Sequence, residues 1–219
     1  MIVDERIVSF INSFNQDEEG IAEEIRKEAL QQEVPIIRRE TGQFIKTLLE
    51  MNKPNSVLEV GTAVGYSAIF MSKYLPKEAH ITTIENWEPR IAQAKINFER
   101  AKVTEKITLI EGDATEELTK LKGTFDFIFM DAAKGQYINY FPDILRLLAD
   151  GGILLSDNVL QDGEVLDSKF VVERRNRTIH GRMRDYLYTL MNHENLVTSI
   201  LPIGDGVALS VKKMTKTGD

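Results

Sequence analysis

Apolar and polar residues alternate along this chain in two different ways. In residues 1–52, apolar side chains recur at the three- and four-residue spacing of an amphipathic helix, as in residues 7–14. From about residue 55 onward, short apolar runs rich in β-branched residues alternate with segments of helical spacing. The pattern predicts a wholly helical N-terminal extension over residues 1–52, followed by an α/β region. The extension is expected to cover one face of a sheet or to form the contact of a homodimer.

Seven β-rich runs define the α/β region. They are SVLEVG (56–61), HITTIEN (80–86), KITLIEGD (106–113), FDFIFMD (125–131), GGILLSDN (151–158), LVTSILPIG (196–204) and GVALSVKK (206–213). Helical segments separate the first five, which predicts parallel strands covered by helices on both faces. Only a tight turn around residues 204–206 separates the last two, which predicts a C-terminal antiparallel hairpin. We therefore expect a single α/β domain over residues 1–219.

Composition narrows the class of protein. The 219 residues include 42% hydrophobic and 28% charged residues, as in a globular protein. No apolar run approaches the roughly 20 residues that span a bilayer, and no basic-then-apolar signal pattern is present. The absence of cysteine excludes disulfides and thiolate metal sites. We expect a cytoplasmic protein without membrane contact, and the net charge of −7 argues against general coating of nucleic acid, though not against a local basic patch.

Glycines and an acid follow the first two parallel runs, at the edge where open parallel sheets bind ligands. Gly61 and Gly65 permit a sharp turn, but Ala63 replaces the middle glycine of the dinucleotide fingerprint. Glu85 ends the second run and can accept hydrogen bonds from both hydroxyls of a ribose. A solvated acid at a strand end is an equally good interpretation of Glu85.

The third run ends in Asp113 and Ala114, where a carboxylate and a backbone N–H can read an adenine edge. A turn, a ribose acceptor and an adenine reader together favour an adenosine ligand that lacks a pyrophosphate. S-Adenosylmethionine fits this description better than a nicotinamide dinucleotide does. A nicotinamide-dependent oxidoreductase is therefore the less favoured interpretation.

Polar residues also end the fourth and fifth runs. Asp131 follows one apolar run, and Asp157 and Asn158 follow the next. Because adjacent parallel strands lie roughly 5 Å apart, these oxygens can converge on one hard cation such as Mg²⁺, with Ca²⁺ or Mn²⁺ as alternatives. Capping of the following helices is the competing interpretation. Lys134 lies close by, and a neighbouring dication would lower its pKa, making it a candidate base rather than a merely solvated lysine.

Five blocks of the sequence resemble the catechol and caffeoyl-CoA O-methyltransferases, in order and with that family's spacing. They are Glu59-Val60-Gly61-Thr62, Gly65-Tyr66-Ser67, Phe129-Met130-Asp131-Ala132-Ala133-Lys134, Ser156-Asp157-Asn158-Val159 and Pro202-Ile203-Gly204-Asp205-Gly206. The resemblance covers residues from about 35 to the C-terminus. It implies a seven-stranded, mostly parallel Rossmann-like sheet of the class I methyltransferases, binding of S-adenosylmethionine and a divalent cation.

The resemblance also assigns roles to single residues. Lys134 would be the catalytic base, and Asp131 would serve the cofactor and, with Asp157 and Asn158, the metal. The implied cofactor contacts are Glu59, Gly61, Thr62 and Ser67 at the methionine moiety, Glu85 at the ribose, Asp113 and Ala114 at the adenine, and Ile37 beside the cofactor. The implied reaction is in-line methyl transfer to one of two neighbouring oxygens that the cation chelates.

Within that family, residues 32–36, 62–69 and 131–137 most resemble the bacterial tRNA 5-hydroxyuridine methyltransferases. A 5-hydroxyl beside the 4-carbonyl of uridine presents the two neighbouring oxygens that the chemistry requires. The resemblance therefore favours methylation of wobble 5-hydroxyuridine in tRNA to 5-methoxyuridine. A small-molecule O-methyltransferase for catechol-type aromatics is the alternative, and a non-catalytic cofactor- or RNA-binding module is a third hypothesis that the complete metal set disfavours.

A basic segment independently favours an anionic substrate. Residues 169–185 carry a local charge of +4. The acidic residues are Glu173 and Asp185, and the basic residues are Lys169, Arg174, Arg175, Arg177, Arg182 and Arg184. Arginines there could contact the phosphates and bases of a splayed anticodon loop. An acyl-CoA would suit the same charge. The competing interpretation is the solvated face of a helix that buries residues 170, 171, 183 and 187, and His180 and His193 are interpreted as surface residues.

Overall fold

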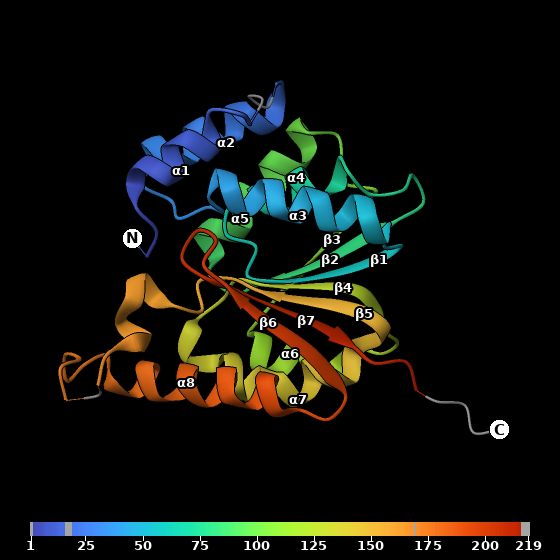
Figure 1. Ribbon diagram of the computed structural model, residues 1–219. Helices are drawn as coiled ribbons and strands as arrows, with labels where there is room; N and C mark the ends of the chain where they lie inside the picture. The colour runs from blue at the N-terminus through green and yellow to red at the C-terminus, as the bar shows by residue number, and fades with distance from the viewer. Residues whose placement is uncertain (1, 16–18, 169, 216–219) are drawn as a thin grey trace. The chain divides into compact units, whose positions relative to one another are not determined.

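The computed structural model describes residues 2–15, 19–168 and 170–215 (Figure 1). The chain divides into two compact units, here called the N-terminal unit (Asp4–Glu117) and the C-terminal unit (Leu118–Asp219 with Met1–Val3). The single-domain interpretation stays a prediction. Among the described residues, no helix is long and apolar enough to cross a membrane.

The N-terminal unit contains three parallel strands. Strand β1 (Ser56–Val60) pairs with β2 (His80–Glu85), and β2 pairs with β3 (Ile107–Glu111). The apolar side chains of β1 and β2 are buried, as the near-continuous apolar runs predict, whereas Leu109 and Ile110 of the edge strand β3 are half-buried. The helices of this part of the chain are α1 (Glu5–Asn12), α2 (Ile21–Gln31), α3 (Arg39–Asn52), α4 (Tyr66–Ser72), α5 (Glu88–Arg100) and α6 (Ala114–Lys120).

The N-terminal extension is helical only in part, since residues 32–38 form no helix. Helices α2 and α3 both pack against α4 and bury their apolar faces, while their covering of the sheet stays a prediction. Helix α1 differs because none of its residues is buried. Phe10 and Phe14 are 65% and 71% exposed and contact each other edge to face. The homodimer therefore stays a prediction.

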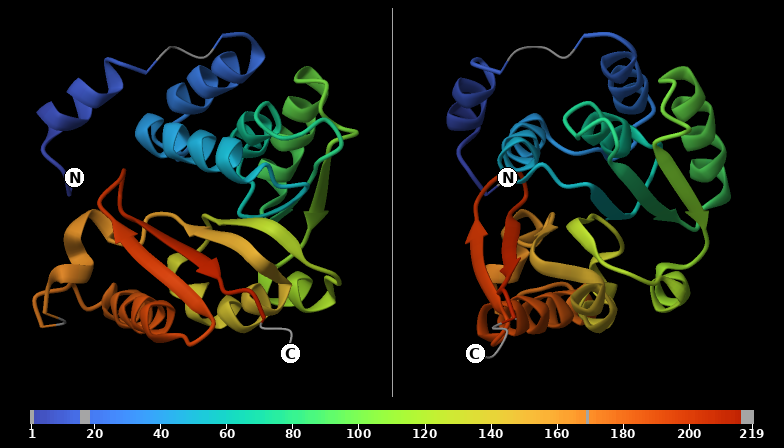
Figure 2. Two further views of the ribbon diagram at one scale, coloured as in Figure 1. Left: turned by 45° about the vertical axis from the view of Figure 1, so that its right-hand side comes forward. Right: turned by 90° about the vertical axis from the view of Figure 1, so that its right-hand side faces the viewer.

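The C-terminal unit contains four strands. Strands β4 (Phe125–Met130) and β5 (Leu148–Ser156) are parallel, β7 (Val207–Lys212) is antiparallel to β5, and β6 (Leu196–Leu201) is antiparallel to β7. The predicted C-terminal hairpin is confirmed. Two views show α7 (Tyr137–Leu147) and α8 (Arg177–Asn192) on the same face of these strands (Figures 1 and 2). The short 3₁₀ helices η1 (Lys134–Gln136) and η2 (Gln161–Leu166) follow β4 and β5.

The strand order is β3-β2-β1-β4-β5-β7-β6. This order confirms the predicted Rossmann-like fold with a seven-stranded, mostly parallel sheet and a C-terminal antiparallel hairpin. The residues that the sequence suggests for ligand binding lie at the carboxyl ends of the first five strands. In open parallel sheets, ligands bind at this edge.

Candidate functional site

The turn between β1 and α4 depends on glycine at Gly65. Gly65 has a φ of +81°, and a Cβ there would come within 2.5 Å of the Phe98 ring. Ala63 also has a positive φ, 45°, an uncommon conformation for a residue with a side chain. The turn is closed by the N–H of Gly65, which donates to the carbonyl of Thr62 at 2.8 Å. A tight loop with close helix packing therefore explains the glycine that the sequence singled out.

A buried chain of hydroxyl groups ends on Glu59, which is fully buried. Thr83 donates to the Glu59 carboxylate at 2.6 Å, and its hydroxyl lies 2.6 Å from that of Thr62. Thr62 is therefore the donor to Thr83. Ser67 donates a further hydrogen bond to Glu59. The structure thus brings together Glu59, Thr62 and Ser67 and adds Thr83, while their contact with a cofactor stays a prediction.

Sequence reasoning missed Thr83, although a signal for it exists. It is a polar residue within the apolar strand β2, and the sheet register pairs it with Glu59 on β1. A polar pair at one level of a buried sheet needs mutual hydrogen bonds. The register that reveals this pair is a tertiary property.

Glu85 fastens the loops at the ends of β1 and β2. Its carboxylate accepts hydrogen bonds from the N–H groups of Ala63 at 2.8 Å, and of Asn86 and Trp87 at 3.0 Å. The ionised group can accept about four hydrogen bonds, which leaves capacity for a ligand hydroxyl. Its role at a ribose stays a prediction, but it is not merely a solvated acid.

Asp113 shapes the turn after β3 in a similar way. It accepts a hydrogen bond from the N–H of Thr115 at 2.8 Å and one from the side chain of Asn86 at 3.3 Å. Hydrogen bonds from Thr115 are the main reason that the pKa of Asp113 lies below its usual value. Ala114 begins α6 beside it, and Ile37 is buried in the segment before α3.

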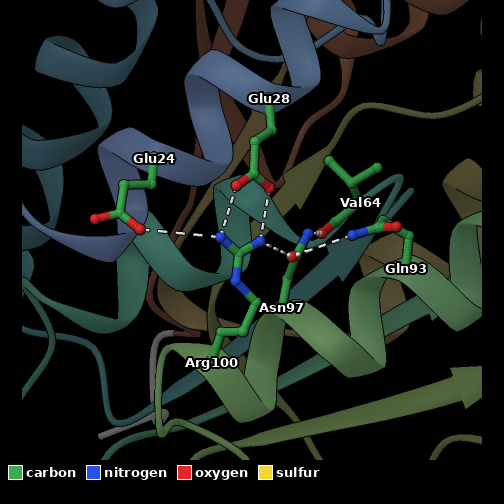
Figure 3. A network of polar contacts seen from close by, with 6 residues as sticks. All are labelled: Glu24, Glu28, Val64, Gln93, Asn97 and Arg100. Carbon is green, nitrogen blue, oxygen red and sulfur yellow. Dashed lines mark hydrogen bonds and ion pairs between the residues drawn. The ribbon is translucent and has the colours of Figure 1, made fainter.

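A polar network holds the turn after β1 from outside (Figure 3). The buried Asn97 of α5 donates to the Val64 carbonyl at 2.8 Å. Arg100 donates to Asn97 at 3.1 Å and to both carboxylate oxygens of Glu28 at 2.6 and 2.7 Å. Hydrogen bonding to Arg100 also lowers the pKa of Glu28. The network connects α2, through α5, to the turn that carries Gly65. Sequence reasoning missed Asn97, a polar residue on the otherwise apolar inner face of α5.

In the C-terminal unit, the register of β4 and β5 aligns the predicted metal ligands. Met130 pairs with Ser156, so Asp131 and Asp157 are the next residues on their strands, and the Asp157 N–H donates to the Met130 carbonyl at 2.9 Å. The side-chain amide of Asn158 donates to Asp131 at 3.2 Å. The structure thus brings Asp131, Asp157 and Asn158 into one cluster.

The electrostatics of this cluster fit a cation. Asp157 is 2% exposed, and burial, reinforced by the charge of Asp131, raises its pKa to about 7. If the Asn158 amide group rotates so that its oxygen faces Asp131, all the potential metal ligands are oxygens. Mg²⁺ prefers such oxygen ligands. The described residues contain no cluster of three or more His, Cys, Asp and Glu side chains suited to a metal. The predicted set is of another kind, two carboxylates and one amide.

The helix-cap interpretation of these acids does not hold. The residue at the N-terminal cap of η1 is Ala133, and that of η2 is Leu160, and neither helix has a side-chain cap. Asp131 and Asp157 therefore lie before the caps and are available for another role.

Tyr137 contacts the ends of both β4 and β5. Sequence reasoning missed it because its position has the spacing of an ordinary apolar residue of a helix. Its fully buried hydroxyl lies 3.0 Å from the Met130 carbonyl and 3.1 Å from the Asp157 carbonyl, and it accepts from the Ala132 N–H at 3.3 Å. Edge-to-face packing against Tyr186 of α8 fixes the ring. This clamp sets the spacing between the two acid-bearing strand ends.

Lys134 begins η1 and is half-buried. Its positive charge acts on Asp157 and opposes the rise in that group's pKa. Arg182 of α8 donates to the Gly135 carbonyl at 3.1 Å and so fastens η1. Lys134 is thus held close to the acid cluster, while its role as a base stays a prediction.

The basic segment, residues 169–185, agrees only in part with its interpretation as the solvated face of a helix. Met183 and Leu187 are buried as expected, but Phe170 and Val171 are 79% and 74% exposed. Lys169 lies outside the described residues. All five arginines are exposed; Arg177 and Arg184 donate to backbone carbonyls, Arg182 holds Gly135, and Arg175 pairs with Glu173.

The interpretation of His180 as a surface residue is wrong. His180 is 3% exposed, and its Nε2 lies 3.1 Å from the Asp167 carbonyl, because α8 buries this side of the helix. His193 is half-buried, with its ring edge to face against Phe141.

Comparison with known proteins bears on both halves of the chain. A family model described as O-methyltransferase matches residues 12–213. A catechol O-methyltransferase of Niastella koreensis is 38% identical over 58% of this chain and 59% of that protein, so the match spans less than two thirds of that relative. Caffeoyl-CoA O-methyltransferase 5 of Nicotiana tabacum is 31% identical over 77% of this chain and 73% of its own length.

Solved structures give the same result. A Staphylococcus aureus protein with a provisional caffeoyl-CoA O-methyltransferase assignment superimposes with a TM-score of 0.84 and 34% identity, over 94% of this chain and 98% of that one. A methyltransferase from Podospora anserina, solved with bound SAH, has a TM-score of 0.85 and 27% identity, over 96% and 97%. With the strand order and the family match in agreement, the chain belongs to the O-methyltransferase family.

Proposed function

We propose that this protein transfers the methyl group of S-adenosylmethionine to one of two neighbouring oxygens of a substrate, with the help of a divalent cation. The observation that carries the proposal is the cluster of Asp131, Asp157 and Asn158, two crowded carboxylates and an amide beside Lys134. Family membership and the SAH bound to the Podospora anserina structure support the cofactor.

The residues of the chain divide the chemistry between them. When bound, S-adenosylmethionine supplies the methyl group, and a cation held by Asp131, Asp157 and Asn158 supplies the chelation that lowers the pKa of a substrate hydroxyl. Lys134 accepts the hydroxyl proton at Nζ. In the N-terminal unit, the hydroxyl chain on Glu59 binds the polar end of the cofactor, and Glu85 orients its ribose.

For the substrate, we propose wobble 5-hydroxyuridine of tRNA. The exposed arginines of residues 174–184, together with the exposed side chains of Phe170 and Val171, support an RNA ligand. Arginine contacts phosphates, and exposed aromatic side chains stack on unpaired bases. The second candidate is a catechol-type small molecule, favoured by the 38% identity to a catechol O-methyltransferase.

The experiment measures both activities of the purified protein with Mg²⁺. tRNA from a strain that lacks the gene should gain 5-methoxyuridine by mass spectrometry, whereas dihydroxybenzoate should be turned over poorly. Arg174→Ala and Arg175→Ala should impair tRNA methylation alone, and Lys77→Ala, an exposed cation of the other unit, serves as control. A normal level of 5-methoxyuridine in the deletion strain, or turnover of the catechol alone, would contradict the tRNA substrate. The catechol-type small molecule would then be the favoured substrate.

A further inference from the structure

The turn between β6 and β7, residues 202–206, lies against the loop that follows β5, residues 158–163. The N–H of Val159 donates to the Gly206 carbonyl at 2.9 Å, which extends the pairing of β5 with β7 beyond both strands. Gly206 has a φ of +83°, and a Cβ there would overlap the Leu160 side chain. Only glycine permits so close an approach of the turn to the loop. We call residues 158–163 the ligand loop, because its first residue is a proposed metal ligand.

The ligand loop has an unusual backbone. Asn158, Gln161 and Asp162 have φ values of 57°, 50° and 52°. This left-handed region is uncommon for residues with a side chain, although asparagine enters it more easily than most. Several such residues in one short loop persist only where the surroundings impose them. The position of the Asn158 side chain, whose amide donates to Asp131, therefore depends on contacts from outside the loop.

Asp205 of the turn supplies such contacts. It is 8% exposed, and its Oδ1 accepts a hydrogen bond from the N–H of Asp162 at 2.5 Å. Its backbone carbonyl accepts a second hydrogen bond, from the N–H of Leu160 at 3.1 Å. The carboxylate also lies close to the proposed metal site, because its charge adds to the rise in the pKa of Asp157 that burial mainly causes. Asp205 thus holds the ligand loop at two of its residues.

We propose that Asp205 is a positioning residue, which fixes the ligand loop and so holds Asn158 where it can bind the cation together with Asp131. The inference rests on the proposed metal-dependent function. Among the residues that the structure describes, no three His, Cys, Asp or Glu side chains form a group suited to a metal, so Asp205 acts through the loop and not as a further ligand. A hydrogen bond from a backbone N–H to a carboxylate is stronger than one between neutral groups. Groups that orient metal ligands commonly contribute roughly 10–100-fold to the affinity.

Two substitutions separate the position of the Asp205 carboxylate oxygen from its charge. Asp205→Asn keeps an acceptor oxygen in place and removes the charge, whereas Asp205→Glu keeps the charge and shifts the oxygens by one methylene. Mg²⁺ binding is measured by calorimetric titration of the full chain without cofactor, and hydrogen exchange of the backbone amides 158–163 is measured without metal. Asp205→Asn should stay within about threefold of wild type in both measurements. Asp205→Glu should bind Mg²⁺ about ten- to a hundredfold more weakly. Its Asp162 amide should exchange at least about tenfold faster, since that amide loses its acceptor.

The matched control is Asp150→Glu. Asp150 also accepts a backbone hydrogen bond, from Thr215 at 3.1 Å, so this variant should change the Mg²⁺ affinity less than about twofold. If the longer side chain prevents folding of Asp205→Glu, Asp205→Ala takes its place. Wild-type Mg²⁺ affinity in Asp205→Glu overturns the proposal, and so does an equal loss of affinity in Asp205→Asn, because the charge and not the acceptor position would then matter. If the wild type itself bound no Mg²⁺, the proposed function would fail, and the exchange rates alone would decide whether Asp205 fixes the loop.

Discussion

The proposed cofactor region of the N-terminal unit and the proposed metal region of the C-terminal unit are stabilised in opposite ways. In the first, each acid is matched by donors from the chain itself, with hydroxyls on Glu59 and backbone N–H groups on Glu85. In the second, a buried carboxylate lies beside another carboxylate, and its pKa rises to about 7. The first region is organised before any ligand binds. The second is electrostatically incomplete, as expected of a site built for a cation.

Removing the metal region's central acid gives the largest expected effect. Asp157→Ala should lower O-methyltransferase activity about a thousandfold, because chelation of the substrate contributes several kcal/mol to the transition state. Calorimetric titration of Mg²⁺ should show the loss of binding directly. Asp126→Ala, an acid within β4 outside the cluster, is the control, and unchanged activity in Asp157→Ala would remove the metal region from the mechanism.

The pH dependence of stability separates the two regions next. The pKa of Asp157 is raised in the folded protein from 3.8 to about 7, a change worth about 4 kcal/mol at full size. The folded state then holds this proton more tightly than the unfolded state. The stabilisation that the protonated Asp157 contributes to the folded state is therefore complete below pH 4 and is lost as the pH rises to 7. Urea unfolding without metal should show this loss in wild type but not in Asp157→Asn. Mg²⁺ should restore stability at pH 8. An unfolding free energy of the wild type that does not change between pH 4 and 8 would contradict the raised pKa of Asp157.

In the cofactor region, the turn at Gly65 should tolerate no side chain. Gly65→Ala places a Cβ 2.5 Å from the Phe98 ring at a positive φ. We expect roughly 2–4 kcal/mol lower unfolding free energy and loss of cofactor binding. Gly123→Ala is matched, since Gly123 has a φ of +83° but open space for a Cβ, and should lose only about 1 kcal/mol. Equal losses would show that strain in φ, not packing against Phe98, requires the glycine.

The clamp at Tyr137 connects packing to the metal region. Tyr137→Phe removes the hydroxyl between the Met130 and Asp157 carbonyls, and should cost about 1–2 kcal/mol of stability. Metal affinity should fall roughly tenfold, because groups that orient ligands commonly contribute 10–100-fold. Tyr188→Phe, at a side chain that is 72% exposed, should change neither quantity. An unchanged Mg²⁺ affinity with reduced stability would limit Tyr137 to the core.

The smallest expected effect concerns the network behind the cofactor turn. Asn97→Ala removes the hydrogen bond to the Val64 carbonyl and should raise the KM for S-adenosylmethionine about three- to tenfold, with little change in kcat. Gln93→Ala, at the edge of the same network, should have no more than a twofold effect (Figure 3). A loss in kcat instead of KM would indicate that Asn97 does more than hold the turn.

The succession of strands along the chain and the chemistry at their ends follow from the sequence alone. The apolar runs before Asp131 and Asp157 predict parallel strands, and parallel strands present their carboxyl ends at one edge. The blocks around Gly61, Gly65 and Lys134 are enough to identify the family, because several motifs in order are far more specific than one.

Tertiary structure alone decided what surrounds those residues. Thr83, Asn97 and Tyr137 lie 24, 33 and 20 positions from the residues they bind, and no local pattern encodes such pairings. The same holds for the rise in the pKa of Asp157, which depends on burial beside Asp131. The error on His180 is of another kind, because its spacing from Met183 and Leu187 already places it on the buried face of α8. Periodicity records which face of an element is apolar. Register and packing decide which polar groups meet inside, and through them the charge that each of the two regions holds.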